Sequence, residues 1–508
     1  MSALDPAPAT ASTPRKARSG AQRGAWLGVI AAAMLGACAV GPDFVRPAPP
    51  KVDRYTSQPL AAATVAADGH AQQFTPGMTL TADWWRLFGS TQLDALVQQA
   101  VANNPTLEAA EASLRQSQDN LRAGYGVFFP QVAAGLNAVR ERAVPLENGL
   151  QTRGTVFNLV TLSGTVSYAL DVFGGKRRAV ESLRAQADDA RYASQAAYLT
   201  LSANVVNASI ARAAYAAEIR ATRELIELEK QQLGATEAQV QAGTTSYASV
   251  LSIRSLIAAN QAALAPLEQK ISQTEHLLAT LEGVTPAEAK LPDIELGDLT
   301  LPVDLPVSLP SELVRQRPDI LSAEAQLHAA SANIGVATAA MFPSISLSGS
   351  YGGAGTSFGS LSANSVKFWS IGPSVTVPLF QGGSLWFGRK AAIDAYQQAQ
   401  ANYRQTVLSA FEQVADTLKA LEHDAQALEA QAEAQRTAAA ALALLQVNYR
   451  AGMAAYIDVL TADVQYHAAT IAYLQTVAQR HQDTVALFVA LGGGWWSVPS
   501  PLAEGHTP

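Results

Sequence analysis

Cysteine, charge and long apolar runs are all scarce in this sequence of 508 residues. Its single cysteine, Cys38, excludes an intrachain disulfide framework and any metal cluster held by several cysteines. Charged residues make up only 15% of the chain, and the net charge of −7 argues against a protein that binds nucleic acid through a basic surface. No uninterrupted apolar run reaches the ~20 residues that a transmembrane helix needs.

Residue patterns typical of enzymes are also missing. The seven histidines form no His-x-His or His-x-x-x-His pair, so we expect no helix-borne metal site. There is no GxxxxGK[ST] loop to bind phosphates. Glu111 and Glu324 could form a carboxylate pair, but they occupy equivalent helical positions in two halves of the chain, and we interpret them as structural. The sequence therefore predicts a protein that is not an enzyme and holds no cofactor and no metal.

The N-terminal residues indicate the compartment. A positive region with Arg15 and Arg23 precedes an apolar run over 25–37, which is the layout of a secretory signal peptide. The run ends in Leu35-Gly-Ala-Cys38, which resembles a bacterial lipobox, so residues 1–37 form a predicted lipoprotein signal and Cys38 carries lipid such as palmitate. The alternative is an incidental cysteine. Residues 38–90 read as an extended arm and the start of a further region, because the segment up to about residue 76 is rich in Pro, Ala and Thr.

The remainder of the chain contains an internal duplication. Residues 105–130 align without gaps with residues 318–343, and 241–251 align with 450–460 at nearly the same offset. Repeat 1 therefore covers 91–282 and repeat 2 covers 311–491, joined by a proline-rich linker over 283–310. A flexible tail is predicted over 492–508.

Each repeat predicts one helix of unusual length. No Gly or Pro occurs from Lys176 to Leu233 or from Arg389 to Ala451, and such stretches would extend roughly 85–95 Å as helices. Helices of this length imply a coiled-coil or tubular assembly. The predicted helices are 91–127, 176–242 and 246–282 in repeat 1, and 311–341, 388–451 and 453–491 in repeat 2.

Two segments in each repeat alternate between apolar and small polar residues. The predicted strands are about 130–142, 155–171, 343–354 and 366–379. This period of two fits strands with one lipid-facing side and one wet side, and it assigns Ile345, Leu347, Trp369 and Val375 to the lipid. In a membrane such strands must close into a barrel, and four are too few, so several chains must share one. A soluble, half-exposed sheet is the alternative.

Five motifs then resemble one family. In chain order they are Gly41-Pro-Asp-Phe-Val-Arg-Pro47, Asp83-Trp-Trp-Arg-Leu-Phe88, Leu170-Asp-Val-Phe-Gly-Gly175, Arg317-Pro-Asp-Ile320 and Met341-Phe-Pro-Ser-Ile-Ser-Leu347. Together with the duplication and the lipobox they resemble the lipoprotein branch of the TolC family, the OprM-like or NodT-type outer-membrane channels of efflux pumps.

The resemblance implies an α+β membrane protein. Its fold would be a homotrimeric, twelve-stranded transmembrane β-barrel with four strands per chain, continued by a periplasmic α-helical coiled-coil barrel. It implies a passive duct for drugs or other small molecules in the outer membrane. The partners would be a periplasmic adaptor (membrane fusion) protein and an inner-membrane pump of the RND type. Two alternatives stay open, namely a structural trimeric lipoprotein without a pore and a duct for type I protein secretion.

The candidate gate lies where the long helices turn back. Gly243 and Gly452 occupy equivalent turns that end the two longest helices, so we expect hairpin turns at the tip of the tunnel. After the second turn come Asp458 and Asp463, which threefold symmetry would multiply into rings of like charge. The resemblance adds Ile457 as an apolar gate residue and Tyr449 as part of a linking network. The alternative is that both acids are solvated residues favoured at a helix start.

Overall fold

The computed structural model describes residues 39–497 except 144–145, 148–149, 152–153 and 364–365. Cys38 and the predicted signal over 1–37 therefore lie outside the described residues. The chain forms two compact units. The first includes residues 122–182 and 330–394, and the second includes 45–121, 183–329 and the chain from 395 onward.

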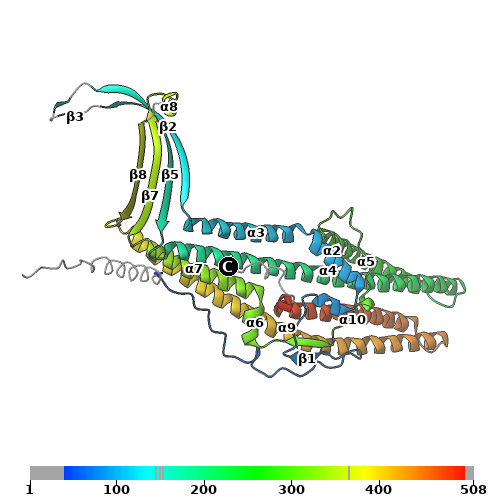
Figure 1. Ribbon diagram of the computed structural model, residues 1–508. Helices are drawn as coiled ribbons and strands as arrows, with labels where there is room; N and C mark the ends of the chain where they lie inside the picture. Colours follow the sequence, from blue (N-terminus) through cyan, green and yellow to red (C-terminus); the bar gives the residue numbers. More distant parts are fainter. Residues whose placement is uncertain (1–38, 144–145, 148–149, 152–153, 364–365, 498–508) are drawn as a thin grey trace, which may run out of the picture. The chain divides into compact units, whose positions relative to one another are not determined.

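The first unit contains one antiparallel sheet of four strands, drawn as arrows in Figure 1. Its order is β2-β5-β7-β8, so each strand pairs with its neighbour and the sheet is open along β2 and β8. The strands are β2 (Gln131–Ala143), β5 (Thr155–Leu170), β7 (Ser344–Gly355) and β8 (Val366–Thr376). The β2–β5 connection carries the short pair β3 (Leu146–Glu147) and β4 (Leu150–Gln151), and the β7–β8 connection carries α8 (Ser360–Ala363).

The register places most of the large apolar residues of the four strands on one face. Ile345 pairs with Val375, and Tyr351 pairs with Trp369. Leu347 follows on the same face, because residues two apart along a strand share a face. Trp369 is 73% exposed and Val375 is 60% exposed. Large apolar side chains on this face are therefore left in contact with surroundings outside the chain.

The opposite face carries small polar residues. Ser346 pairs with Ser374, and the hydroxyls of Ser350 and Ser370 lie 2.8 Å apart. β8 ends three residues earlier than the predicted 379, at Thr376. The reason is Pro378, which has no N–H to donate and so does not continue the ladder. Pro373 lies inside β8, which in the described chain pairs on one side only, with β7.

Two helical hairpins, whose longer helices begin in the first unit, make up most of the second unit. One consists of α4 (Gly175–Gln241) and α5 (Tyr247–Leu281), and the other of α9 (Ser384–Arg450) and α10 (Tyr456–Ala490). In Figure 1 the four helices lie alongside one another. α4 and α9 each have 67 residues, which corresponds to about 100 Å of helix.

Each shorter helical segment is broken at a proline, which differs from the prediction of single helices over 91–127 and 311–341. Repeat 1 contains α2 (Thr91–Asn103) and α3 (Pro105–Tyr125), and repeat 2 contains α6 (Pro310–Gln316) and α7 (Pro318–Ala339). The residue before a proline is pushed out of the helical region, and both breaks occur there. At the first break the Asn104 side chain accepts hydrogen bonds from the N–H groups of Thr106 and Leu107 and so starts the next helix.

The predicted arm and the predicted linker pair with each other instead of remaining irregular. β1 (Gln73–Pro76) forms a parallel pair with β6 (Asp304–Val307). The Asp83 motif then forms a 3₁₀ helix (Trp84–Phe88) whose Trp84 is fully buried. A pairing between segments this far apart in the chain leaves no local pattern, so the composition of the arm did not predict it.

The predicted flexible tail begins later than expected, because residues 492–497 are packed. Gly492, Gly493 and Gly494 are buried at positive φ, and a Cβ on Gly494 would lie 2.5 Å from the Leu80 carbonyl oxygen. The indole N–H of Trp495 donates to the carbonyl of Gln316 at 2.8 Å. Glycines are needed here because a neighbouring backbone approaches closely.

Candidate functional site

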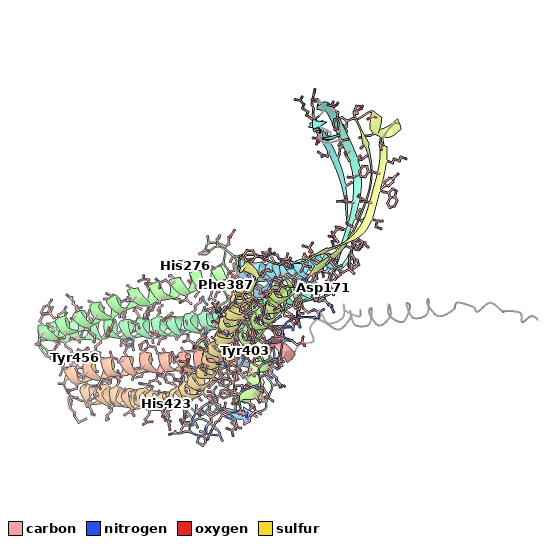
Figure 2. All side chains as sticks on the ribbon, turned by 90° about the vertical axis from the view of Figure 1, so that its left-hand side faces the viewer. Asp171, His276, Phe387, Tyr403, His423 and Tyr456 are labelled. Atoms are coloured by element: carbon pink, nitrogen blue, oxygen red, sulfur yellow. The ribbon has the colours of Figure 1, made fainter. Side chains whose placement is uncertain are left out.

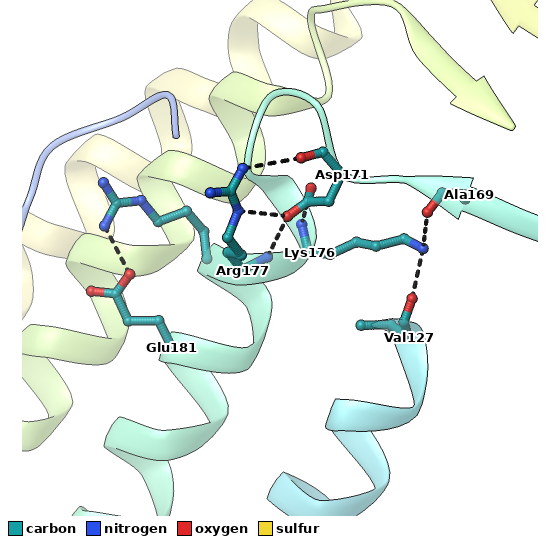
Figure 3. A network of polar contacts seen from close by, with 7 residues as sticks. Val127, Ala169, Asp171, Lys176, Arg177 and Glu181 are labelled. Carbon is teal, nitrogen blue, oxygen red and sulfur yellow. Dashed lines mark hydrogen bonds and ion pairs between the residues drawn. The ribbon is translucent and has the colours of Figure 1, made fainter. Parts of the chain in front are cut away.

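The strand-to-helix junction after β5 is fixed by one carboxylate (Figure 3). Asp171 accepts hydrogen bonds from the backbone N–H groups of Lys176 and Arg177, each at 2.9 Å. It thereby caps the first turn of α4, whose N–H groups have no partner within the helix. The Lys176 ammonium donates to the carbonyls of Val127 and Ala169 at 2.8 and 2.7 Å. The motif at 170–175 is therefore a device that joins a strand to a very long helix.

The first described residues pass over this junction. The Val40 N–H donates to the Phe173 carbonyl at 3.0 Å. Gly174 has a φ of +77°, and a Cβ there would lie 2.6 Å from the Cα of Ala39. Three residues after Val40, the Asp43 carboxylate accepts a hydrogen bond from the Arg178 guanidinium at 2.6 Å. The residue that follows Cys38 is thus held where β5 ends and α4 begins.

The glycines predicted at the hairpin turns adopt the conformation that such turns require. Gly243 and Gly452 both have a φ of +73°. The backbone N–H of Gly452 donates to the backbone carbonyl of Tyr449 at 2.9 Å. The backbone N–H of Met453 donates to the backbone carbonyl of Asn448 at 2.8 Å. This is the Schellman pattern, which satisfies carbonyls at a helix end. In Figure 2 the label of Tyr456 marks the end of the helices where these turns lie.

Asp458 and Ile457 are exposed beside the second turn. Ile457 is 58% exposed. The Asp458 carboxylate accepts a hydrogen bond from the backbone N–H of Ala455 at 3.0 Å, so it caps the start of α10. Asp463 follows five residues later, which is about 140° around the helix, and it does not share the direction of Asp458.

Tyr449 and Asp463 line a cavity of about 290 Å³ between three helices. Its polar and aromatic lining includes Glu229 and Gln232 from α4, Gln446 and Tyr449 from α9, and Tyr456 and Asp463 from α10. The Tyr449 hydroxyl donates to the Gln239 side chain at 3.0 Å, which links α9 to α4. The ring of Tyr449 also lies 5.5 Å from that of Tyr456.

The two carboxyl groups at this cavity are desolvated. Burial raises the pKa of Asp463 to about 6. Burial also raises the pKa of Glu229, and the nearby Asp463 adds to that rise. Neither shift has a compensating cation among its causes. Both groups favour the neutral form more than an exposed carboxyl does.

The sequence predicts Tyr449 and Asp463 as gate candidates, not as residues of a shared cavity, and neither Glu229 nor Gln239 was named from it. The available signal for Glu229 was its place in an apolar stripe of α4, between the buried Ile226 and the partly buried Leu233. A single acid in such a stripe indicates either a buried hydrogen bond or a site. For Gln239 the sequence carries no comparable signal, because its partner lies on another helix.

The other candidates have structural partners. Glu324 accepts from the Arg46 guanidinium at 2.6 Å, which anchors the arm to α7 and agrees with a structural role. Glu111 lies 3.8 Å from Arg115, one turn along the same helix. Among the described residues, no three His, Cys, Asp or Glu side chains are grouped so as to hold a metal ion.

A sheet with an exposed apolar face and two helices of 67 residues are typical of a membrane protein. The comparisons with known proteins give the family. The family model described as outer membrane efflux protein matches residues 96–284 and 309–493, and the chain belongs to this family. It is therefore an efflux channel protein of the bacterial outer membrane.

Three relatives illustrate the likeness. The pyoverdine export outer membrane protein OpmQ of Pseudomonas putida is 30% identical over 416 residues, which cover 81% of this chain and 88% of the relative. The probable outer membrane lipoprotein SilC of Salmonella typhimurium is 28% identical, over 91% of this chain and 96% of the relative. The solved outer-membrane channel OprN superposes with a TM-score of 0.80 at 28% identity, over 90% of this chain and 100% of OprN.

Proposed function

We propose that three copies of this chain form one duct, with a shared twelve-stranded barrel in the outer membrane and a helical tunnel in the periplasm. The observation that carries this proposal is the open sheet. Its apolar face is exposed, and in the part of the chain that the structure describes its edge strands, β2 and β8, each have one side without a partner strand. In lipid an unpaired edge leaves backbone groups unsatisfied, so β8 of one copy must pair with β2 of the next. The number three rests on the family resemblance.

Residues on the apolar face take defined roles in this proposal. Ile345, Leu347, Trp369 and Val375 face lipid, and the serines and threonines opposite them face the water-filled interior. The described parts of the β2–β5 and β7–β8 connections face the outside of the cell. A wet inner face has no use in a structural rod, so this arrangement favours a duct over a lipoprotein without a pore.

α5 also requires neighbours. It is long and apolar enough to cross a membrane by length and composition, and only 17% of its most apolar window is buried in the chain. Polar contacts tie it to α4, however, including Arg254 to Glu237 at 2.7 Å and Arg223 to Glu268 at 2.7 Å. Such ion pairs are unfavourable in lipid. If the apolar side of α5 is buried against another copy in the tunnel, the helix can have an apolar surface that is exposed in the single chain and still keep its ion pairs with α4.

The anchor and the partners complete the proposal. Cys38 carries the lipid, and the position of Ala39 at the start of α4 supports this, because that junction is the helical end of the membrane strands. A periplasmic adaptor protein and an inner-membrane pump of the RND type supply the cargo and the energy. The cargo is a small molecule, as the name of the pyoverdine export relative suggests.

The gate is proposed at the tip. Asp458 and Ile457 are exposed at the start of α10, where three copies would bring them together around an axis. A ring of three carboxylates would attract cations and repel anions. Tyr449 holds α9 against α4 through Gln239 and so stabilises the closed arrangement. Asp463 remains a candidate for the ring, although it lines a cavity within its own chain.

Planar-bilayer recording of the purified protein, with its mass measured in detergent, tests the proposal. We expect a trimer that conducts, and Asp458→Ala should raise its conductance and lower its cation selectivity. Asp463→Ala is the second arm, and Glu412→Ala, at an exposed position of α9, is the control. A trimer without conductance would favour the structural lipoprotein, and a monomer would refute the shared barrel. In cells, deletion should increase the accumulation of a small dye, whereas loss of a secreted protein would indicate type I secretion.

A further inference from the structure

The cavity between α4, α9 and α10 contains an unusual arrangement of charge. Glu229 is only 3% exposed, and its Oε1 accepts a hydrogen bond from the Asn260 side chain at 2.7 Å. Its second oxygen, Oε2, is buried without a hydrogen-bond partner. Leaving a buried acceptor unpaired costs ~1–3 kcal/mol, and more when the group is charged. Glu229 lines the cavity, so a rotation of its carboxylate would bring Oε2 to a partner bound there.

A second carboxyl group, that of Asp463, lines the same cavity from α10. Two acids on facing helices repel each other unless something neutralises them. In the ranges that the structure covers, neither acid has an ion pair with Lys, Arg or His. Lys230, next to Glu229 in the sequence, binds Glu227 at 2.6 Å. Arg450 also lines the cavity, but its side chain is exposed to solvent.

The side chains that line the cavity indicate which kind of group could neutralise the carboxylates of Glu229 and Asp463. Besides the two carboxylates the lining offers the amide oxygens of Gln232 and Gln446 and the phenol of Tyr449. These are oxygen donors, which hard divalent cations prefer over nitrogen and sulfur. The cavity of about 290 Å³ has room for an ion together with several waters, each of which takes about 30 Å³. An ion that keeps part of its water shell, as Mg²⁺ usually does, needs only one or two carboxylates.

We propose that this cavity is a binding site for a hydrated divalent cation of the Mg²⁺ or Ca²⁺ class, held between Glu229 of α4 and Asp463 of α10. The site lies inside one chain and is distinct from any ring that Asp458 forms between copies. Because Glu229 and Asp463 belong to different hairpins, the cation joins the two hairpins near their turns. If the proposed tip gate is correct, cation binding favours its closed state.

Binding is tested with Mn²⁺ as the probe, measured by electron paramagnetic resonance on the full-length protein in detergent at pH 7.5. We expect a site that Mg²⁺ or Ca²⁺ empties by competition. Glu229→Gln and Asp463→Asn should each weaken it about ten-fold or more. Glu224→Gln is the matched control, since it removes one exposed charge from the same helix. Asp458→Asn should leave the site intact.

Thermal unfolding provides a second readout that does not need a ligand count. In EDTA, Glu229→Gln should melt at a higher temperature than the wild type, because it removes one of two repelling charges. Added Mg²⁺ should raise the melting temperature of the wild type by a few degrees and leave that of Glu229→Gln unchanged.

Three results would overturn the site. They are Mn²⁺ binding that is unchanged in Glu229→Gln, Mn²⁺ binding that is lost only in Asp458→Asn, and a wild-type melting temperature that responds to acid but not to Mg²⁺. The last result would mean that a proton neutralises the pair. Conductance in EDTA tests the proposed channel separately. The site is connected to the gate only if Mg²⁺ lowers the conductance of the wild type and does not lower that of Glu229→Gln.

Discussion

Placing an arginine at Ile371 should strongly destabilise the membrane sheet. Ile371 is 70% exposed on the apolar face and is the sixth of the 11 residues of β8. With a rise of ~3.3 Å per residue and a tilt near 40°, five residues on either side span about 13 Å each, which matches half of an apolar band of ~25 Å. Ile371 therefore lies at mid-membrane in the proposed barrel.

An arginine at this depth costs about 2–4 kcal/mol per chain. That corresponds to a roughly 30- to 700-fold change in the folding equilibrium. The same change at Val375 should cost only about 0–1 kcal/mol, because Val375 is the penultimate residue of β8 and lies near the interface. The expected loss therefore depends on depth as well as on face.

Urea unfolding of the protein in phospholipid vesicles measures these differences. Ser370→Arg is the matched control, because Ser370 is the neighbour of Ile371 on the opposite face, where its hydroxyl meets that of Ser350. We expect Ser370→Arg to be tolerated and to shift ion selectivity toward anions. Equal losses from Ile371→Arg and Ser370→Arg would refute the assignment of the faces.

Three further predictions concern the anchor, a buried acid and the glycines. Cys38→Ser should abolish acylation in intact-mass analysis while part of the protein still reaches the outer membrane, because the barrel inserts independently of the lipid. Asp424→Asn should stabilise the protein by about 1 kcal/mol at pH 8 and by less at pH 5, since burial and the neighbouring Asp483 raise the pKa of Asp424 to about 7. Gly494→Ala should destabilise by about 2 kcal/mol or more, whereas Gly234→Ala, which is helical with open space around it, should stabilise by ~0.5–1 kcal/mol.

The sign of the Asp424 effect follows from linkage. An acid whose pKa is raised in the folded state binds protons more tightly there, so the folded state loses stability as the pH rises from the unfolded-state pKa to the raised folded-state pKa. Chemical denaturation at both pH values checks it, and a variant that is less stable than the wild type at pH 8 would contradict it. An unmodified Cys38 in the wild type would contradict the anchor, and equal melting temperatures of the two glycine variants would show that the tail is loose.

The elements that the sequence predicted well are those with local causes. The long helices begin and end within a few residues of the predicted limits, because uninterrupted helix-forming residues and a glycine at each turn act within a few positions. The four strands follow from a period of two that is visible in the sequence alone. Even the helix breaks had a local signal in Pro105 and Pro318, which the prediction of single helices passed over.

The elements that the sequence did not predict depend on residues far apart in the chain. The β1–β6 pair, the packing of Gly494 against Leu80 and the meeting of Glu229 with Asp463 each join distant segments. A periodic pattern indicates which face of an element is buried, but it does not indicate which other element covers that face. The sequence thus determined the repeats, the long helices, the alternating strands and the turns. Only the tertiary structure decided which acids share a cavity, because the desolvation and repulsion that define that site arise when α4 and α10 pack together.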